Sequence, residues 1–163
     1  MDHLVLCERA AAAPHASARC LQLALSAEER TRLRGRRESV CGVVLLLQLP
    51  RGEPLRPGEW LTTADAAGWV EVQAAAEALL EVRAEEPLAL LQAAYHLGNR
   101  HVSLELRSGE LRLLEDGVLE ELMRQRGLLI EHRLAPFLPE PGAYAAASHA
   151  HSHIHNHDSD RPR

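Results

Sequence analysis

Five histidines stand at alternate positions near the end of the chain: His149, His151, His153, His155 and His157. Neutral imidazole is a nitrogen donor that suits nickel, copper and zinc, and the residues between the rings leave the backbone free to wrap around an ion. Neighbouring rings at this spacing would point to opposite sides of a helix, so we expect a flexible chelator or an extended strip. A purification tag is the alternative, but tags are normally uninterrupted, and this segment continues to Arg163. The pattern predicts binding of a divalent transition metal without naming which.

A second group of histidines lies in the segment Tyr95-His96-Leu97-Gly98-Asn99-Arg100-His101. This segment ends a predicted helix and enters a predicted strand, so His101 can project from a rigid frame. One histidine supplies one ligand, and a two-fold symmetric dimer would bring a second copy of His101 to the same axis. By residue type alone, a lone histidine is more often structural than ligating. His96 fits the structural role, because the helix dipole favours a histidine in the last turn.

The remaining residues carry no signature of catalysis, and we expect the chain not to be an enzyme. All 18 basic residues are arginine, which excludes a lysine Schiff base and a phosphate-loop lysine. Neither a GxSxG nor an HExxH motif is present, and the acidic residues are spread without an evident pair. Glu115 and Asp116, at the start of a predicted helix, are most simply capping residues.

The three cysteines are Cys7, Cys20 and Cys41. Their odd number and wide spacing fit neither a disulfide framework nor a CxxC metal knuckle. We interpret them as buried or incidental thiols.

Charge and hydropathy narrow the classes of partner. The 163 residues include 18 basic and 23 acidic side chains, for a net charge of −5, and scattered arginines argue against nucleic acid. The densest arginine run, 30–37, is predicted to be a strand with a solvated edge. The longest apolar run, Val43 to Leu47, is too short to cross a bilayer, and no secretory signal is visible, so we expect a cytoplasmic protein without membrane contact.

The first part of the chain predicts a small all-β domain over residues 1–73. Strands are indicated by short apolar runs or by alternation of apolar and polar residues, at 3–7, from 19 to 25, at 30–37, 43–49 and 69–72. Glycines and prolines separate these segments. The alanines at 74–76 mark a junction between domains.

The second part of the chain predicts a domain over residues 77–145. Its elements are a strand at 78–83, a helix at 87–96, strands at 102–106 and 111–114, a helix at 117–126 and a strand at 128–133. Gly98 and Gly127 follow the helices where left-handed caps are expected. The order βαββαβ predicts an α+β protein whose second domain is ferredoxin-like. Residues 146–163 have too few apolar side chains to pack, so this tail is expected to be disordered without a ligand.

Several segments, taken in order, closely resemble the urease accessory protein E family of nickel metallochaperones. The resemblance lies in the segments 49–52, 55–59, 95–101, 135–137, 139–140 and 142–144, and in the histidine-rich end. It implies an N-terminal peptide-binding domain, a C-terminal metal-binding domain and a homodimer formed through the second domain. It also implies that His101 binds nickel together with its symmetry mate. Some relatives carry extra histidines where this chain has residues 114–117.

The resemblance implies that the protein delivers Ni²⁺ to apo-urease within a complex that includes accessory proteins and a GTPase. Copper should bind more tightly than nickel to nitrogen donors, and zinc also suits imidazole, so selectivity would come from metal availability and partner docking. Two other functions stay open. The first is a general nickel or zinc buffer that uses the tail, and the second is a peptide-binding assembly factor whose metal is incidental.

Overall fold

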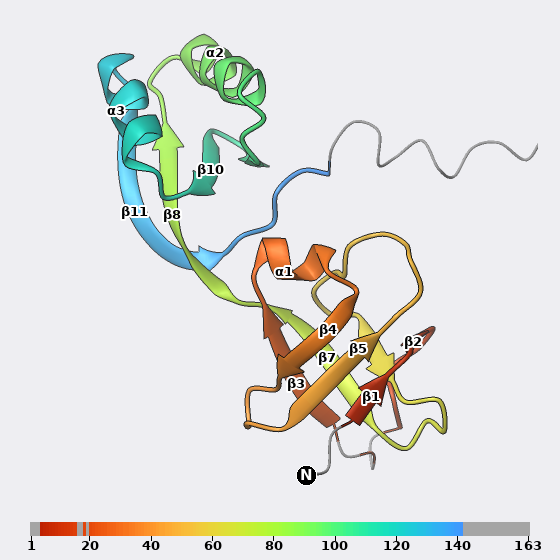
Figure 1. Cartoon of the computed structure of the whole chain (residues 1–163). Helices are drawn as coiled ribbons and strands as arrows, with labels where there is room; N and C mark the ends of the chain where they lie inside the picture. The colour runs from red at the N-terminus through yellow and green to blue at the C-terminus, as the bar shows by residue number, and fades with distance from the viewer. Residues whose placement is uncertain (1–3, 16–17, 19, 142–163) are drawn as a thin grey trace, which may run out of the picture.

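The chain forms two domains of mixed α and β structure (Figure 1). The computed structural model describes residues 4–15, 18 and 20–141, so the five histidines of the tail lie outside the described residues. None of the described helices has both the length and the apolar composition needed to cross a bilayer.

The first domain contains two sheets. The order β1-β5-β4 joins Leu4–Leu6, Val44–Gln48 and Arg34–Glu38, and the order β2-β6-β7-β3 joins Glu8–Ala10, Trp60–Thr62, Trp69–Ala74 and Cys20–Leu25. Only Cys7 separates β1 from β2, and its N–H donates to the Thr62 carbonyl at 3.2 Å. The two sheets therefore continue into one another around a shared core.

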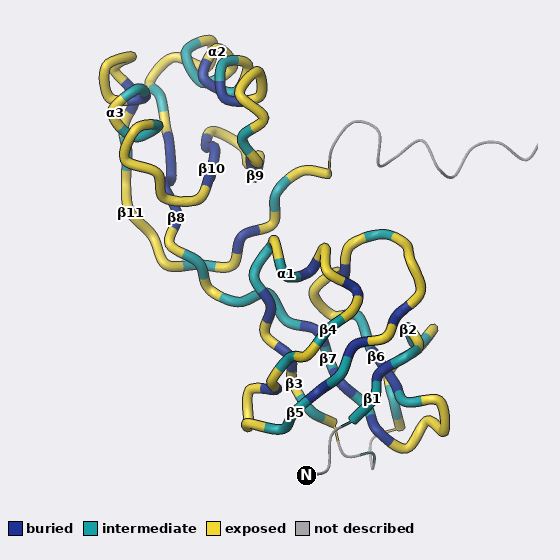
Figure 2. The backbone as a smooth tube through the Cα atoms, viewed as in Figure 1, coloured by how far each residue is buried: buried dark blue, intermediate teal, exposed yellow. Residues whose placement is uncertain are grey.

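That core consists of aliphatic side chains, namely Leu6, Leu23, Leu25, Leu33, Leu45, Leu47, Leu49, Leu55, Leu61, Val70 and Val72. Alternation in β3, β5 and β7 places every second residue inside, as period-two patterning requires. Figure 2 shows these buried positions along the strands. The strands predicted around 21–25, 43–49 and 69–72 are confirmed, whereas the short strands β2 and β6 were not predicted.

The prediction of one strand over residues 30–37 is wrong in its first half. Residues Ala27–Thr31 form helix α1, which Ser26 and Glu29 cap reciprocally: the Ser26 hydroxyl accepts from the Glu29 N–H, and the Glu29 carboxylate accepts from the Ser26 N–H. This capping box starts a helical turn and overrides the alternation of arginines. Arg30 is consequently buried, and only β4 forms the expected edge strand.

The second domain begins with β8 (Ala76–Arg83), directly after β7. It continues with α2 (Pro87–Gly98), β9 (Glu105–Arg107), β10 (Glu110–Leu114), α3 (Gly117–Gln125) and β11 (Leu129–Pro136). The predicted βαββαβ order is thus present, although β9 begins three residues later than expected. The sheet order is β11-β8-β10-β9, and each neighbouring pair is antiparallel.

The two helices and one face of this sheet share an apolar core that includes Leu80, Val82, Leu97, Leu113 and Met123. Pro87 occupies the start of α2, where its missing N–H costs no helical hydrogen bond. Asp116 caps α3 by accepting from the Val118 and Leu119 N–H groups, as predicted. The helices thus cover one face of the sheet with apolar side chains, and the opposite face of the sheet is packed differently.

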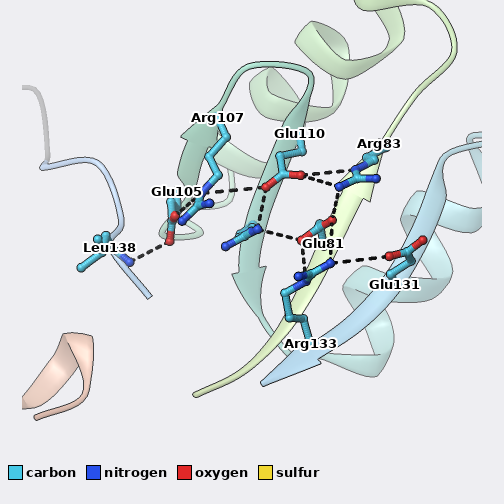
Figure 3. A network of polar contacts seen from close by, with 9 residues as sticks. Glu81, Arg83, Glu105, Arg107, Glu110, Glu131, Arg133 and Leu138 are labelled. Atoms are coloured by element: carbon cyan, nitrogen blue, oxygen red, sulfur yellow. Dashed lines mark hydrogen bonds and ion pairs between the residues drawn. The ribbon is translucent and has the colours of Figure 1, made fainter. Parts of the chain in front are cut away.

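Charged side chains fill the other face (Figure 3). Glu81 is 1% exposed, and its carboxylate forms ion pairs with Arg83, Arg112 and Arg133 at 2.6, 2.9 and 2.8 Å. Burial would raise the pKa of Glu110, but the hydrogen bond from Arg83 and the charges of Arg112 and Arg83 lower it overall. This carboxylate therefore stays ionised although it is largely buried.

A C-terminal strap, defined as residues 137–141, returns from β11 toward β9. The buried Phe137 accepts a hydrogen bond at its carbonyl from the Arg30 guanidinium at 2.6 Å, which joins the strap to the first domain. Burial lowers the pKa of Arg30, while the charge of Glu77 opposes this change. Further along, the Glu140 N–H donates to the Leu104 carbonyl at 2.7 Å.

Candidate metal site

His101 stands at the end of the turn that follows α2. Its backbone is left-handed, with φ of 58°, and its N–H donates to the Gly98 carbonyl at 2.9 Å. The left-handed cap predicted at Gly98 is therefore wrong, because Gly98 remains in the helix and the conformation falls three residues later. Histidine adopts this region more readily than most residues. The turn directs an exposed imidazole away from the core.

An open cavity of about 410 Å³ lies beside His101. It is lined by Ala94, His101, Val102, Ser103, Leu104, Leu106 and Glu140. Glu140 comes from the strap, whose hydrogen bond to Leu104 fixes it along the segment that leads into β9. The cavity therefore brings the exit of α2 and the last described residues of the chain to one place.

His101 has too few neighbouring donors to complete a metal site within one copy of the described chain. Residues 4–15, 18 and 20–141 contain no group of three or more His, Cys, Asp or Glu side chains that could hold a metal ion. The symmetric pairing of His101, predicted from the sequence, stays a prediction. His149, His151, His153, His155 and His157 lie outside the described residues.

Exposed apolar side chains follow one side of α2. Leu88, Leu91 and Tyr95 are 63, 67 and 68% exposed and are spaced by three and four residues, as one helical stripe requires. His96 is half-buried, and its ring meets the Tyr95 ring edge-to-face at 5.5 Å between centroids. The stripe leads along the helix toward the turn that carries His101.

A third histidine, His132, forms a cluster that the sequence analysis missed. Its Nδ1 lies 2.5 Å from a Glu115 carboxylate oxygen, and its Nε2 lies 3.2 Å from a Glu120 oxygen. The hydrogen bond to Glu115, followed by that to Glu120, raises the pKa of His132. Carboxylates on opposite sides of one ring make an ion-pair clip, since they do not converge on a shared metal position. Glu115, predicted as a capping residue, has this role instead.

None of the three cysteines forms a disulfide. Cys7 is half-buried, whereas Cys20 and Cys41 are exposed, which leaves the incidental alternative for the latter two. All three cysteines lie in the first domain, whereas His101 lies in the second.

Two family models match nearly the whole chain. The model described as the UreE urease accessory protein, N-terminal domain, matches residues 5–75, and the corresponding C-terminal domain model matches residues 77–161. A urease accessory protein UreE from a Synechococcus strain is 60% identical over 129 residues, covering 79% of this chain and 74% of that protein. The protein of the same name from Parasynechococcus marenigrum is 53% identical over 146 residues, which cover 90% of this chain and 96% of that protein.

Proposed function

The chain belongs to the UreE urease accessory protein family, and from this premise we propose that it is a metallochaperone that delivers Ni²⁺ to apo-urease. The two family models and the names of the relatives support a role in urease maturation. Accessory proteins are distinct from the enzyme that they assist, which fits the lack of a catalytic motif in the sequence. We place the protein in the cytoplasm, with urease and a GTPase among its partners.

The observation that carries the proposal is the position of His101. It is an exposed imidazole on a rigid turn, with too few donors around it in one copy of the described chain. A two-fold dimer through the second domain would bring two copies of His101 together and supply a pair of nickel ligands. The apolar stripe of Leu88, Leu91 and Tyr95 supports such a dimer, because burying it removes apolar surface from water at about 25 cal/mol per Å².

The second domain is, in our proposal, ferredoxin-like. The βαββαβ order and the sheet order β11-β8-β10-β9 support this assignment. In this arrangement the turn after the first helix and the strap after the last strand both reach the neighbourhood of β9. The fold thereby brings His101 close to the end of the described chain.

The histidines of the tail would supply further nickel ligands. Glu140 lines the cavity beside His101, and His149 stands nine positions further along the chain. An extended chain of that length spans about 30 Å, so the tail histidines can reach the His101 pair. Several similar imidazole arrangements would let a partner displace the ligands one at a time, which suits delivery better than storage. Copper and zinc would compete, so availability and docking set the selectivity.

The functional test is activation of apo-urease at limiting nickel. A chaperone should raise the yield of active urease, whereas a nickel or zinc buffer, the second candidate, should lower it. An assembly factor with incidental metal would act equally after removal of residues 147–163. Lower urease activation in the first comparison, or equal activation without residues 147–163 in the second, would reject nickel delivery.

The site test compares nickel binding of His101→Ala and its parent, both lacking residues 147–163, by titration calorimetry. We expect loss of the tightest site with an unchanged fold, because His101 is exposed at an element end. His96→Ala in the same background is the matched control and should retain that site. Equal nickel binding by the His101→Ala variant and its parent would reject the assignment.

A further inference from the structure

Three arginines border one open cavity of the first domain. The cavity has a volume of about 430 Å³, and Arg32, Arg34 and Arg51 line it together with Leu33, Leu49 and two small residues. These residues come from the end of α1, the start of β4 and the segment after β5, which lie at the same end of the domain (Figure 1). Sites for small molecules have volumes of about 300–1,000 Å³, so the cavity has room for one.

The three guanidinium groups are only partly engaged by the protein. Arg51 is exposed and has no partner among the described residues. Arg34 donates through Nε to the Leu49 carbonyl at 3.2 Å, which holds its stem beside the cavity and leaves its terminal nitrogens to a ligand. Arg32 pairs with Glu28, but both side chains are exposed, and an exposed ion pair of this kind is weak. A ligand can therefore engage all three arginines.

The charge around the cavity is positive, although the whole chain has a net charge of −5. Among the described residues, no acidic side chain lines the cavity. Two acidic residues lie near it in the sequence: Glu28 is the partner of Arg32, and Glu53 follows Arg51 by two positions. Cationic groups gathered in a concave site raise the local concentration of anions. The cavity thus has an electrostatic preference for an anion.

The two strands that border the cavity are already paired with each other. The Leu49 N–H donates to the Leu33 carbonyl at 3.1 Å, and Arg34 stands opposite Gln48 in the ladder between β4 and β5. β5 also pairs with β1 on its other side. A polypeptide in the cavity would find no free backbone groups between these strands. Recognition therefore rests on the arginine side chains, which favours a small anion over an added strand.

The number of arginines indicates the class of anion. Guanidinium binds phosphate and carboxylate oxygens, often through two parallel hydrogen bonds. A single carboxylate would match one arginine and leave the other two without a counter-charge. A chain of two or three phosphates carries several charges on a compact frame and presents oxygens in several directions. Charge and size together therefore favour a phosphate chain.

We propose that this arginine cavity, bordered by Arg32, Arg34 and Arg51, binds a small anion that carries a phosphate chain. Arg34 and Arg51 would donate from groups that have no other acceptor, and Arg32 would exchange Glu28 for a phosphate oxygen. Inorganic tripolyphosphate and a nucleoside triphosphate share this chemistry. The inference goes beyond nickel delivery and needs no metal bound to the second domain.

The test is titration calorimetry of the full-length protein, freed of metal with EDTA and dialysed, against sodium tripolyphosphate. We expect submillimolar binding that weakens as salt is raised, because salt screens exposed charges. Amide shifts of ¹⁵N-labelled protein should appear at Arg32, Arg34 and Arg51 and not in the second domain. Adenosine triphosphate distinguishes the two sources: equal affinity assigns the free chain as ligand, and tighter binding assigns a nucleotide.

Three outcomes would overturn the inference. No binding at millimolar tripolyphosphate, or shifts confined to other surfaces, would mean that the cavity is not a phosphate site. Citrate that binds as tightly as tripolyphosphate would show that charge alone is recognised. Tighter binding of acetylated hexaglutamate would assign the arginines to an acidic polypeptide instead.

Two variants with the same loss of charge separate the cavity from general attraction. Arg51→Gln should weaken tripolyphosphate binding about tenfold, because it removes a charged hydrogen-bond donor from the site. It should fold like the parent, since Arg51 has no partner among the described residues, and circular dichroism checks this. Arg56→Gln neutralises an exposed arginine of the same domain outside the cavity lining and should bind like the parent. Equal affinities of the two variants would reject the site.

Discussion

The interior of the first domain is almost wholly aliphatic, whereas the sheet of the second domain buries a lattice of carboxylates and guanidiniums. Eleven leucines and valines fill the first core, and Arg30 is the one buried charged residue of the described part of that domain. In the second domain Glu81, Glu105, Glu110 and Arg112 are all buried. The difference follows from the number of layers.

The sheets of the first domain pack around each other, so each has an apolar face to cover the other. The second domain has one sheet and one helical layer, and the face away from the helices holds the ion pairs around Glu81. Long arginine side chains cover that face with their stems while their charged ends pair with carboxylates. Buried pairs of this kind give little net stability, but losing one member is costly. The two domains should therefore respond differently to substitution.

The largest effect is expected from Glu81→Ala. Removal of this carboxylate leaves the buried Arg112 guanidinium without its Glu81 partner, which should cost about 3–5 kcal/mol. Trp60 and Trp69 are the two tryptophans of the chain, and both lie in the first domain. Thermal unfolding followed by circular dichroism should shift for the second domain, while the tryptophan transition changes much less.

The double variant Glu81→Leu/Arg112→Leu is the control. It replaces both charges with apolar groups and should be far less destabilised than the single variant. A double variant as unstable as Glu81→Ala would mean that the lattice is a net source of stability.

The next largest effect is expected from Leu45→Ala in the first domain. Leu45 is fully buried, and its truncation should cost about 3 kcal/mol, through lost transfer free energy and the cavity left behind. The tryptophan transition should move to lower temperature. Leu46→Ala, at a half-buried neighbouring position, should cost less. Equal costs at the two positions would contradict the assignment of the core face.

Arg30→Met addresses the contact between the domains. The guanidinium donates to the Leu25 and Phe137 carbonyls, and removing both hydrogen bonds should cost about 1–3 kcal/mol. We also expect the unfolding transitions of the two domains to separate further. Arg32→Met, two residues away and exposed, should change stability by less than about 0.5 kcal/mol. Coincident transitions in Arg30→Met would show that the domains are joined by other contacts.

The smallest effect concerns pH and the His132 clip. Glu115 and Glu120 raise the pKa of His132 in the folded protein, so the protonated ring stabilises the fold. This contribution is fully present below the unfolded pKa of about 6.5 and is lost as pH rises through the folded pKa. His132→Gln should therefore lose stability relative to the parent at pH 6 and match it at pH 9. An NMR titration that gives His132 a pKa at or below 6.5 would contradict the clip.

Local patterns in the sequence predicted much of this structure. Alternation identified buried positions of β3 and β7, and a short apolar run located β5. Asp116 and Gly127 marked the ends of α3 as expected. The arginine run failed because its alternation competed with a capping box that starts at Ser26. The His132 clip could not be predicted, because it depends on how β11 lies beside α3 and the end of β10. Register across a sheet is a property of the whole fold.

The hydrogen bond from Arg30 to Phe137 joins residues 107 positions apart, and this has a consequence for synthesis. Chains grow at about 5–20 residues per second, so roughly 5–20 s pass between the appearance of these two residues. During that interval the first domain can fold around its leucine core. The Arg30 guanidinium stays hydrated, because the Phe137 carbonyl has not yet been synthesised. The hydrogen bond can form only after the second domain has been synthesised. Docking of the two domains through Arg30 is therefore a late step in folding during synthesis.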